Sequence, residues 1–305
     1  MGSRNRLDYL ILVLKGMAMG AADVVPGVSG GTIAFISGIY EELISSINGI
    51  SFALLTTLRK EGFRAFWKSL NGNFLLAVVS GIALSVASLA RLISWLLETK
   101  PVLLWSFFFG LVLASVFLVA KAIGRWHPGT ITMFVIGAIT AWFITSLPPI
   151  ENSAGLPFLF LSGALAICAM ILPGISGAFI LVLLGSYKTV LDAVHLRNLA
   201  ILGAVALGAL FGLLSFARLL KWMFAHFKNG TLALLTGFIL GSLNKIWPWK
   251  RVLETRVYGE KVVPIREENI SPFHYDGDPQ LVYAILLAIV GFSIIFILEK
   301  QASKK

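Results

Sequence analysis

The chain has few charged residues, one cysteine and no cluster of histidines. Only 13% of its 305 residues are Asp, Glu, Lys or Arg, against about 25% in a soluble domain. Cys168 lies alone in an apolar run, which excludes an internal disulfide. The four histidines are scattered along the sequence, so no metal site is expected. Nothing in this composition calls for a cofactor.

Motifs for catalysis are missing as well. The sequence has no Ser-His-Asp arrangement, no H-E-x-x-H, no nucleotide-binding P-loop and no paired Asp-rich metal motif. We therefore expect a protein that is not an enzyme. The formal net charge of +10 is interpreted as basic loops beside a membrane and not as a nucleic-acid surface.

Long apolar runs are what the sequence has in abundance. Hydrophobic residues make up 57% of the chain, and they recur in runs of roughly 17–25 residues, the length that crosses a bilayer core. These runs predict an all-α polytopic membrane protein with a single membrane domain over residues 1–305. The N-terminal apolar segment is expected to be its first structural segment and not a cleaved signal peptide.

One short motif occurs twice. Residues 26–40 read PGVSGGTIAFISGIY and residues 173–187 read PGISGAFILVLLGSY. At an offset of 147 residues the identical pairs are Pro26 and Pro173, Gly27 and Gly174, Ser29 and Ser176, Gly30 and Gly177, Gly38 and Gly185, and Tyr40 and Tyr187. A helix-breaking Pro-Gly in each half of a membrane protein is typical of a transporter built from two repeats, with its substrate site where the broken helices meet.

The repeat continues beyond this motif. At an offset of 127 residues, ARLISW at 90–95 matches ARLLKW at 217–222. We place repeat 1 at about 7–150 and repeat 2 at about 155–300, with a polar loop at about 250–279 that contains a predicted β-hairpin around Gly259. The expected helices are 7–24 with 29–48, 74–97, 102–122 and 131–147 in the first half, and 156–172 with 176–194, 199–225, 231–248 and 280–298 in the second.

Loop charge indicates how the halves are oriented. If each broken pair is a re-entrant hairpin, each half has three full spans and the second half is inverted. The Lys and Arg residues near both termini, in the 59–68 cluster and around 121–125 and 221–228 then lie in the cytoplasm, as the positive-inside rule requires. We therefore expect two inverted repeats in the cytoplasmic (inner) membrane, with both termini cytoplasmic and the 250–279 loop extracytoplasmic.

The Pro-Gly breaks have the chemistry of an anion site. Proline lacks an amide hydrogen and glycine tolerates unusual backbone angles, so the helix stops at Pro26-Gly27 and at Pro173-Gly174. Ser29 is then placed to cap the next helix, which leaves amides open to an anion. We expect the site to use Ser29, Gly30, Gly31 and Thr32 in the first motif, and Ser176 and Gly177 in the second. The alternative is that these glycines serve only close helix packing.

Two arginines lie deep in long apolar segments at matching positions of the repeat. Arg91 and Arg218 are candidates for gripping a phosphate, since guanidinium groups bind phosphate bidentately. The alternative is that both side chains reach the lipid headgroups from near a helix end.

Asp23 stands inside an apolar stretch just before the first break, and Met170 takes its place in the second half. A lone carboxylate there indicates a proton or cation site, with Glu41 as a second candidate for ion coupling. Pairing of Asp23 with Lys15 or an arginine is the alternative.

The segments KGMAMGAADVVPGVSGGTIAFISGIYEELISSI (15–47) and ILPGISGAFILVLLGSYKTVLDAV (171–194) resemble the polyprenyl-phosphate transporter family, over essentially the whole chain. The resemblance implies translocation of undecaprenyl phosphate, or a related lipid carrier, across the cytoplasmic membrane, and its recycling for cell-envelope synthesis. It places the family signature on the two motifs, on Asp23 and on Glu41. The second motif is looser, with Ala178 and Phe179 where the first has Gly31 and Thr32.

Two other functions stay open. One is a secondary transporter of a small soluble anion, which predicts a sealed pocket in place of a groove open to lipid. The other is a membrane enzyme acting on prenyl phosphate. The expected partners are the polyprenyl-phosphate lipid and membrane lipids, with a second copy of the chain as a further candidate.

Overall fold

The computed structural model describes residues 4–25, 28–150, 155–258 and 261–302. The first half of the chain forms α1 (Arg6–Val24), α2 (Gly30–Ile36), α3 (Tyr40–Asn48), α4 (Phe52–Ser69), α5 (Gly72–Thr99), α6 (Pro101–Lys121) and α7 (Pro128–Ser146). The second half forms α8 (Leu156–Ile171), α9 (Gly177–Leu183), α10 (Tyr187–His195), α11 (Leu199–His226), α12 (Lys228–Ser242), the short 3₁₀ turns η1 (Leu243–Ile246) and η2 (Pro272–His274), strands β1 (Lys250–Tyr258) and β2 (Lys261–Asn269), and α13 (Leu281–Ala302).

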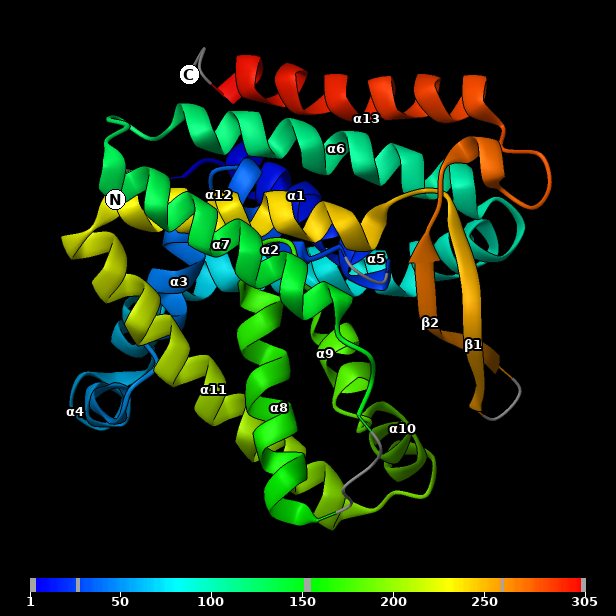
Figure 1. The fold of residues 1–305 in the computed structure, drawn as a ribbon. Helices are drawn as coiled ribbons and strands as arrows, with labels where there is room; N and C mark the ends of the chain where they lie inside the picture. Colours follow the sequence, from blue (N-terminus) through cyan, green and yellow to red (C-terminus); the bar gives the residue numbers. More distant parts are fainter. Residues whose placement is uncertain (1–3, 26–27, 151–154, 259–260, 303–305) are drawn as a thin grey trace.

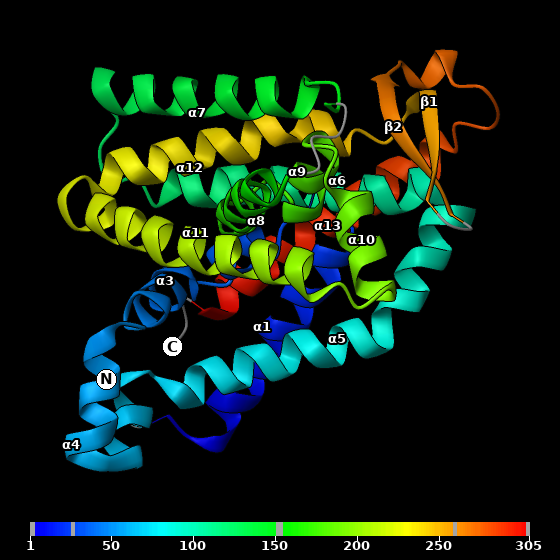
Figure 2. The same cartoon turned by 90° about the horizontal axis from the view of Figure 1, so that it is seen from below.

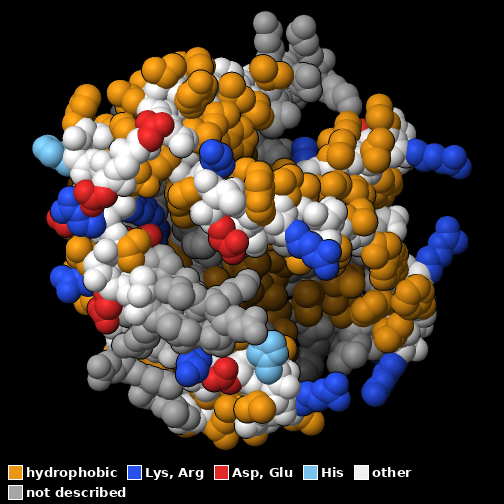
Figure 3. Space-filling model, turned by 90° about the vertical axis from the view of Figure 1, so that its right-hand side faces the viewer, with side chains coloured by type: hydrophobic (Ala, Val, Ile, Leu, Met, Phe, Trp, Pro, Cys, Tyr) orange, Lys and Arg blue, Asp and Glu red, His pale blue; other side chains and the backbone are white. Residues whose placement is uncertain are grey.

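Several of these helices have the length and composition of membrane spans. In the described part of the chain, Gly72–Leu89 of α5 and the whole of α6, α7 and α11 are long and apolar enough to cross a bilayer, and α8 and α13 add shorter apolar helices. Their outer faces leave large hydrophobic side chains uncovered, among them Ile139 and Leu207. Figure 3, which views the side of the molecule that carries the hairpin, shows many hydrophobic side chains interspersed with charged side chains of both signs. The protein is therefore a mostly helical membrane protein.

The long helices pack in four pairs that correspond between the halves. In the first half α1 packs along α5, and in the second α8 packs along α11. The remaining pairs join the halves, because α6 packs on α13 and α7 packs on α12. Each half thus gives its last long helix to the other (Figure 1), and the two halves of the chain form one interlocked body.

Glycines set the distance between the helices at all four crossings. In each pair, one glycine from each helix lies against a backbone carbonyl oxygen of its partner, where a methyl group would overlap that oxygen. Close approach of this kind is how membrane helices gain packing contacts without a hydrophobic driving force. The glycines, each with the residue whose carbonyl it faces, are Gly16 and Val78, Gly81 and Val13, Gly163 and Val205, Gly208 and Phe160, Gly110 and Ala288, Gly291 and Phe107, Gly137 and Leu234, and Gly237 and Phe134.

The prediction of one helix after each break is wrong, because two short helices stand there. Gly38 and Gly185 have positive φ angles of 74° and 65°. Each glycine follows a short helix, and the next residue donates its amide back across the last turn, as in a glycine C-cap. The axes of α9 and α10 consequently differ by 107°.

Two other expectations changed at the periphery. The polar stretch at 59–73, for which no helix was predicted, lies mostly in α4, which bends at Gly62, where φ is 82°. The predicted helix at 231–248 ends earlier, because α12 gives way to η1 after Ser242. The predicted hairpin is confirmed, with β1 and β2 paired antiparallel, although Gly259 itself lies outside the described residues.

Candidate functional site

The first break lies between α1 and α2. Pro26 and Gly27 lie outside the described residues, but α1 ends at Val24 and α2 begins at Gly30. Ser29 has the extended backbone of a helix N-cap, and its Oγ accepts a hydrogen bond from the amide of Gly31 at 3.0 Å. The predicted capping role of Ser29 is thus present in the structure.

The amides at the start of α2 already have partners. The amide of Gly30 donates to Oδ1 of Asp23 at 2.7 Å, and that of Thr32 donates to the Ser29 carbonyl at 2.9 Å. The expectation that these amides stand open is therefore wrong for this conformation. An anion does sit at the helix start, as expected from its electrostatics, but it is the protein's own carboxylate.

The second break is built differently. Helix α8 ends at Ile171, and Pro173 and Gly174 lead to α9, which begins at Gly177. Gly174 has a φ of 98°, a conformation that favours glycine. Ser176 is buried and occupies the N-cap position of α9, but its side chain makes no capping hydrogen bond there. The two copies of the motif therefore start their helices in different ways.

The two breaks touch one another through the side chains of the first. Thr32 Oγ1 accepts a hydrogen bond from the amide of Gly174 at 2.8 Å, and Ser29 Oγ donates to the carbonyl of Met170 at 2.9 Å. Gly31 lies so close to the Ile171 carbonyl that a Cβ there would come within 2.6 Å of its oxygen. Segments more than 140 residues apart in the sequence thus form one buried junction.

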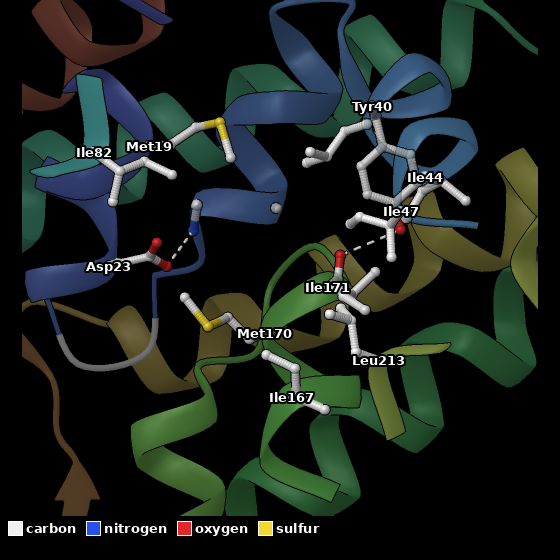
Figure 4. A pocket seen from close by; sticks show the side chains of 13 residues that line it. Met19, Asp23, Tyr40, Ile44, Ile47, Ile82, Ile167, Met170, Ile171 and Leu213 are labelled. Carbon is white, nitrogen blue, oxygen red and sulfur yellow. Dashed lines mark hydrogen bonds between the residues drawn. The ribbon is translucent and has the colours of Figure 1, made fainter. Parts of the chain in front are cut away.

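A cavity of about 150 Å³ lies beside this junction (Figure 4). Its wall is almost wholly apolar, and the groups that break this pattern are the Asp23 carboxylate, the backbone at Gly30 and Gly31, and the Tyr40 hydroxyl. The apolar part of the wall is formed by Met19, Leu43, Ile44, Ile47, Ile82, Ile167, Met170, Ile171 and Leu213. Such a wall suits a mostly hydrocarbon ligand with one polar end.

Tyr40 is a site residue that sequence reasoning missed. It opens α3, only 3% of its surface is exposed, and its hydroxyl donates to the Ile171 carbonyl at 3.2 Å. This is a third hydrogen bond between the first half of the chain and the second break, after those of Ser29 with Met170 and Thr32 with Gly174. The signal was available, because Tyr40 and Tyr187 are an identical pair of the repeat.

The predicted arginines do not join this site. Arg91 and Arg218 are exposed and line no part of the cavity, and neither pairs with another residue that the structure describes. Trp95 and Trp222, one turn further along each helix, are also about half exposed. An arginine with a tryptophan near the end of an apolar helix is typical of a bilayer interface, so the structure favours the headgroup alternative for both.

Of the two acidic residues considered for ion coupling, one lies at the site and the other does not. Asp23 is half-buried on the cavity wall, and no basic side chain in the described ranges forms an ion pair with it. Lys15, the partner considered for it, donates instead to the Ser37 carbonyl at 2.5 Å. Glu41 is not one of the residues that line the cavity, and it forms an exposed ion pair with Lys228 at 3.0 Å. Of the two candidates for ion coupling, only Asp23 adjoins the junction.

No group of three or more His, Cys, Asp and Glu residues in the described part of the chain could hold a metal ion. The chemistry that the site offers is therefore a carboxylate, backbone amides and hydroxyl groups in apolar surroundings.

Known proteins resemble this chain along most of its length. A family model described as undecaprenyl phosphate translocase-like matches residues 19–262, a range that contains both breaks. The chain is 46% identical over 304 residues to a Vibrio cholerae protein named polyprenyl-phosphate transporter, with 98% of each chain covered. It is 35% identical over 257 residues to a Staphylococcus aureus protein of the same name, covering 78% of this chain and 86% of that one. No solved structure matches. The chain therefore belongs to the undecaprenyl phosphate translocase-like family.

Proposed function

We propose that this protein translocates a polyprenyl phosphate, such as undecaprenyl phosphate, across the cytoplasmic membrane so that the lipid carrier can be used again in envelope synthesis. The relatives' names support the substrate class, since both are polyprenyl-phosphate transporters. The phosphate head is the polar end that needs a path, while the prenyl tail stays in the lipid.

The structural observation that supports this proposal is the junction of the two breaks. Non-helical backbone at membrane depth is tolerated only inside protein or beside a polar cavity. Here Ser29 and Thr32 hold the second break against the first, next to a cavity with one carboxylate on its wall. We assign the head-group path to this junction, with Ser29, Gly30, Gly31, Thr32, Ser176 and Gly177 around it, and we infer that its cross-junction hydrogen bonds part during transport.

The proposed orientation rests on how charge is distributed over the ends of the molecule. Figures 1 and 2 place both termini, α4 and the α6–α7 and α11–α12 turns at one end, and the β-hairpin at the other. The first end carries the basic residues Arg59, Lys60, Arg64, Lys68, Lys121 and Arg125. By the positive-inside rule this end faces the cytoplasm, which supports two inverted repeats with re-entrant breaks.

The Asp23 carboxylate is the group at the junction that would interact with the charge of the substrate. Its carboxylate occupies the Gly30 amide in this conformation, and an arriving phosphate would compete for the same donor. Inward movement of one negative charge against a negative-inside potential is opposed by about 2.3 kcal/mol per 100 mV. Proton or cation uptake linked to Asp23 would offset that opposition.

The function is tested in proteoliposomes that contain radiolabelled polyprenyl phosphate in both leaflets, to which a membrane-impermeant phosphatase is added. Protein-free vesicles should release label from the outer leaflet only, and vesicles with the protein should release nearly all of it. Equal plateaus in both would overturn the proposal. Efflux of trapped inorganic phosphate, measured in parallel, identifies a soluble-anion transporter, and label released before phosphatase is added identifies an enzyme.

A further inference from the structure

Three charged side chains meet at the base of the β-hairpin, away from the junction. Lys245 of η1 and Lys250 of β1 both place Nζ near the same oxygen, Oε2 of Glu267 on β2, at 3.1 Å and 3.4 Å. Lys250 also donates to the Lys245 carbonyl at 2.6 Å. Only 8% of the Lys250 side chain is exposed, against 21% for Lys245 and 18% for Glu267.

Two cations share one carboxylate in this cluster, so a positive charge is left over. Burial raises the pKa of Glu267, but the ammonium groups of Lys250 and Lys245 outweigh it and hold that pKa below its usual value. Burial also lowers the pKa of Lys250 to about 8, with Glu267 opposing the shift and Lys245 adding to it. A buried charge without a full counter-charge is costly, and a further anion would complete the cluster.

The two lysines also contact aromatic rings on helices α6 and α9. Lys250 Nζ lies 4.5 Å from the ring centre of Trp105 on α6, and Lys245 Nζ lies 5.1 Å from that of Phe179 on α9. Helix α9 begins at the second break, so Lys245 joins the charged cluster to a helix of the proposed head-group path. The same end of the molecule, seen in Figure 3, has a hollow with hydrophobic side chains, and Lys, Arg, Asp and Glu side chains lie around it.

We propose that Lys245 and Lys250 form a second phosphate site, which receives the head group of the lipid at the hairpin end before or after it passes the junction. The bound phosphate would take the position of the missing counter-charge and accept hydrogen bonds from both ammonium groups, with Glu267 giving up one of them. This site deepens the proposed function and rests on it for the identity of the substrate.

An alternative is that the cluster only anchors the hairpin. The hairpin has other anchors, because Trp247 Nε1 donates to the Ile270 carbonyl and Asn269 Nδ2 donates to the Asn244 carbonyl. An anchor would lose stability when any of the three charges is removed, whereas an anion site responds in opposite directions to loss of a lysine and loss of the glutamate.

The test is titration of inorganic phosphate into the purified full-length protein at pH 7, followed by calorimetry. Lys245→Gln should weaken phosphate binding at least tenfold, and Glu267→Gln should tighten it severalfold because the competing carboxylate is gone. Arg251→Gln is the matched control, because it removes one positive charge from strand β1 next to Lys250, while Arg251 itself pairs with Asp276 at 3.5 Å and not with Glu267. It should leave the affinity unchanged.

No phosphate binding by the wild type, or equal affinity in Lys245→Gln and Arg251→Gln, would overturn the second site. Polyprenyl phosphate in detergent, titrated in parallel, shows whether the lipid uses the same lysines as free phosphate. The proteoliposome assay keeps the two proposals apart. Transport by a wild type that binds no phosphate at Lys245 would refute the second site alone, and phosphate binding without transport would refute the function alone.

Discussion

The side chain of Thr32 accepts a hydrogen bond from the backbone amide of Gly174, at 2.8 Å and across 142 residues of sequence. Both residues belong to the repeated motif, but the bond runs in one direction only, because Phe179 takes the place of Thr32 in the second copy. The junction is therefore asymmetric because the two copies of the motif differ at this position. This asymmetry, together with Asp23 on one side, gives the proposed path two chemically different halves.

Thr32→Val should destabilise the junction. Valine keeps the shape but leaves the buried Gly174 amide without its acceptor, at a cost of about 1–3 kcal/mol. We expect a lower melting temperature in detergent, whereas Thr32→Ser, which keeps the hydroxyl, should stay close to the wild type. Equal melting temperatures for the valine and serine variants would show that the bond contributes nothing.

Asp23→Asn should slow transport while leaving the fold intact. The asparagine side-chain oxygen can still accept from the Gly30 amide, so α2 keeps its partner and only the charge is lost. Glu41→Gln is the control, because Glu41 pairs with Lys228 outside the cavity, and it should transport at nearly the wild-type rate. If Asp23→Asn transports normally with an unchanged pH dependence, Asp23 has no part in coupling.

Gly208→Ala should loosen the α8–α11 crossing. The added methyl group would overlap the Phe160 carbonyl oxygen, and relieving the overlap should cost about 1–3 kcal/mol. Gly203→Ala in the same helix meets no atom within 4 Å and should be neutral or stabilising by up to about 1 kcal/mol, since alanine favours a helix. Thermal unfolding of the two variants separates the effects. A drop for both would mean that the crossing itself is not responsible.

Sulfate binding at the hairpin cluster should weaken as pH rises from 7 to 9. Lys250, with a pKa of about 8, is charged at the lower pH and mostly neutral at the higher, while Glu267 stays ionised throughout. Because the folded-state pKa lies below the ordinary value for lysine, the buried ammonium lowers stability below pH 8, and this cost is relieved as pH rises further.

Sulfate is the probe for this prediction because its own charge is constant over the range. Calorimetry at several pH values measures the change, and Lys250→Gln should show a flat profile. A wild-type affinity that does not vary between pH 7 and 9 would rule out Lys250 as a ligand.

Local features of the sequence predicted much of this fold. Apolar run length placed α5 and α11 within two residues of their observed ends, and Pro-Gly placed the breaks between α1 and α2 and between α8 and α9. The turn around Gly259 predicted the hairpin. The bends at Gly38 and Gly185 were missed because the hydrophobic pattern continues through them, and α4 was missed because its charged residues were interpreted as a loop.

The sequence motifs indicated which residues to consider for the candidate site, but not how those residues are arranged. The two motifs drew attention to Ser29, Thr32 and Gly174, and each of these residues takes part in a hydrogen bond between the two breaks. That Asp23 occupies the Gly30 amide could not be inferred, because it depends on how α1 folds back on α2. Arg91 and Arg218 occupy matching positions of the repeat, but a repeat position does not tell which face of the helix is turned towards the site. Their exposed positions therefore could not be predicted.

In the proposed mechanism the two breaks must part for the phosphate head to cross, and a reversible crosslink between them tests this step. Ser29→Cys and Met170→Cys, in a Cys168→Ser background, introduce one thiol on each side of the junction, at two residues that are neighbours because Ser29 Oγ donates to the backbone carbonyl of Met170 at 2.9 Å. Transport of polyprenyl phosphate is measured in proteoliposomes with the reduced and the fully crosslinked protein. Oxidation should stop transport, and a reductant should restore it. Crosslinked protein that transports as fast as its reduced form would show that the breaks do not need to part.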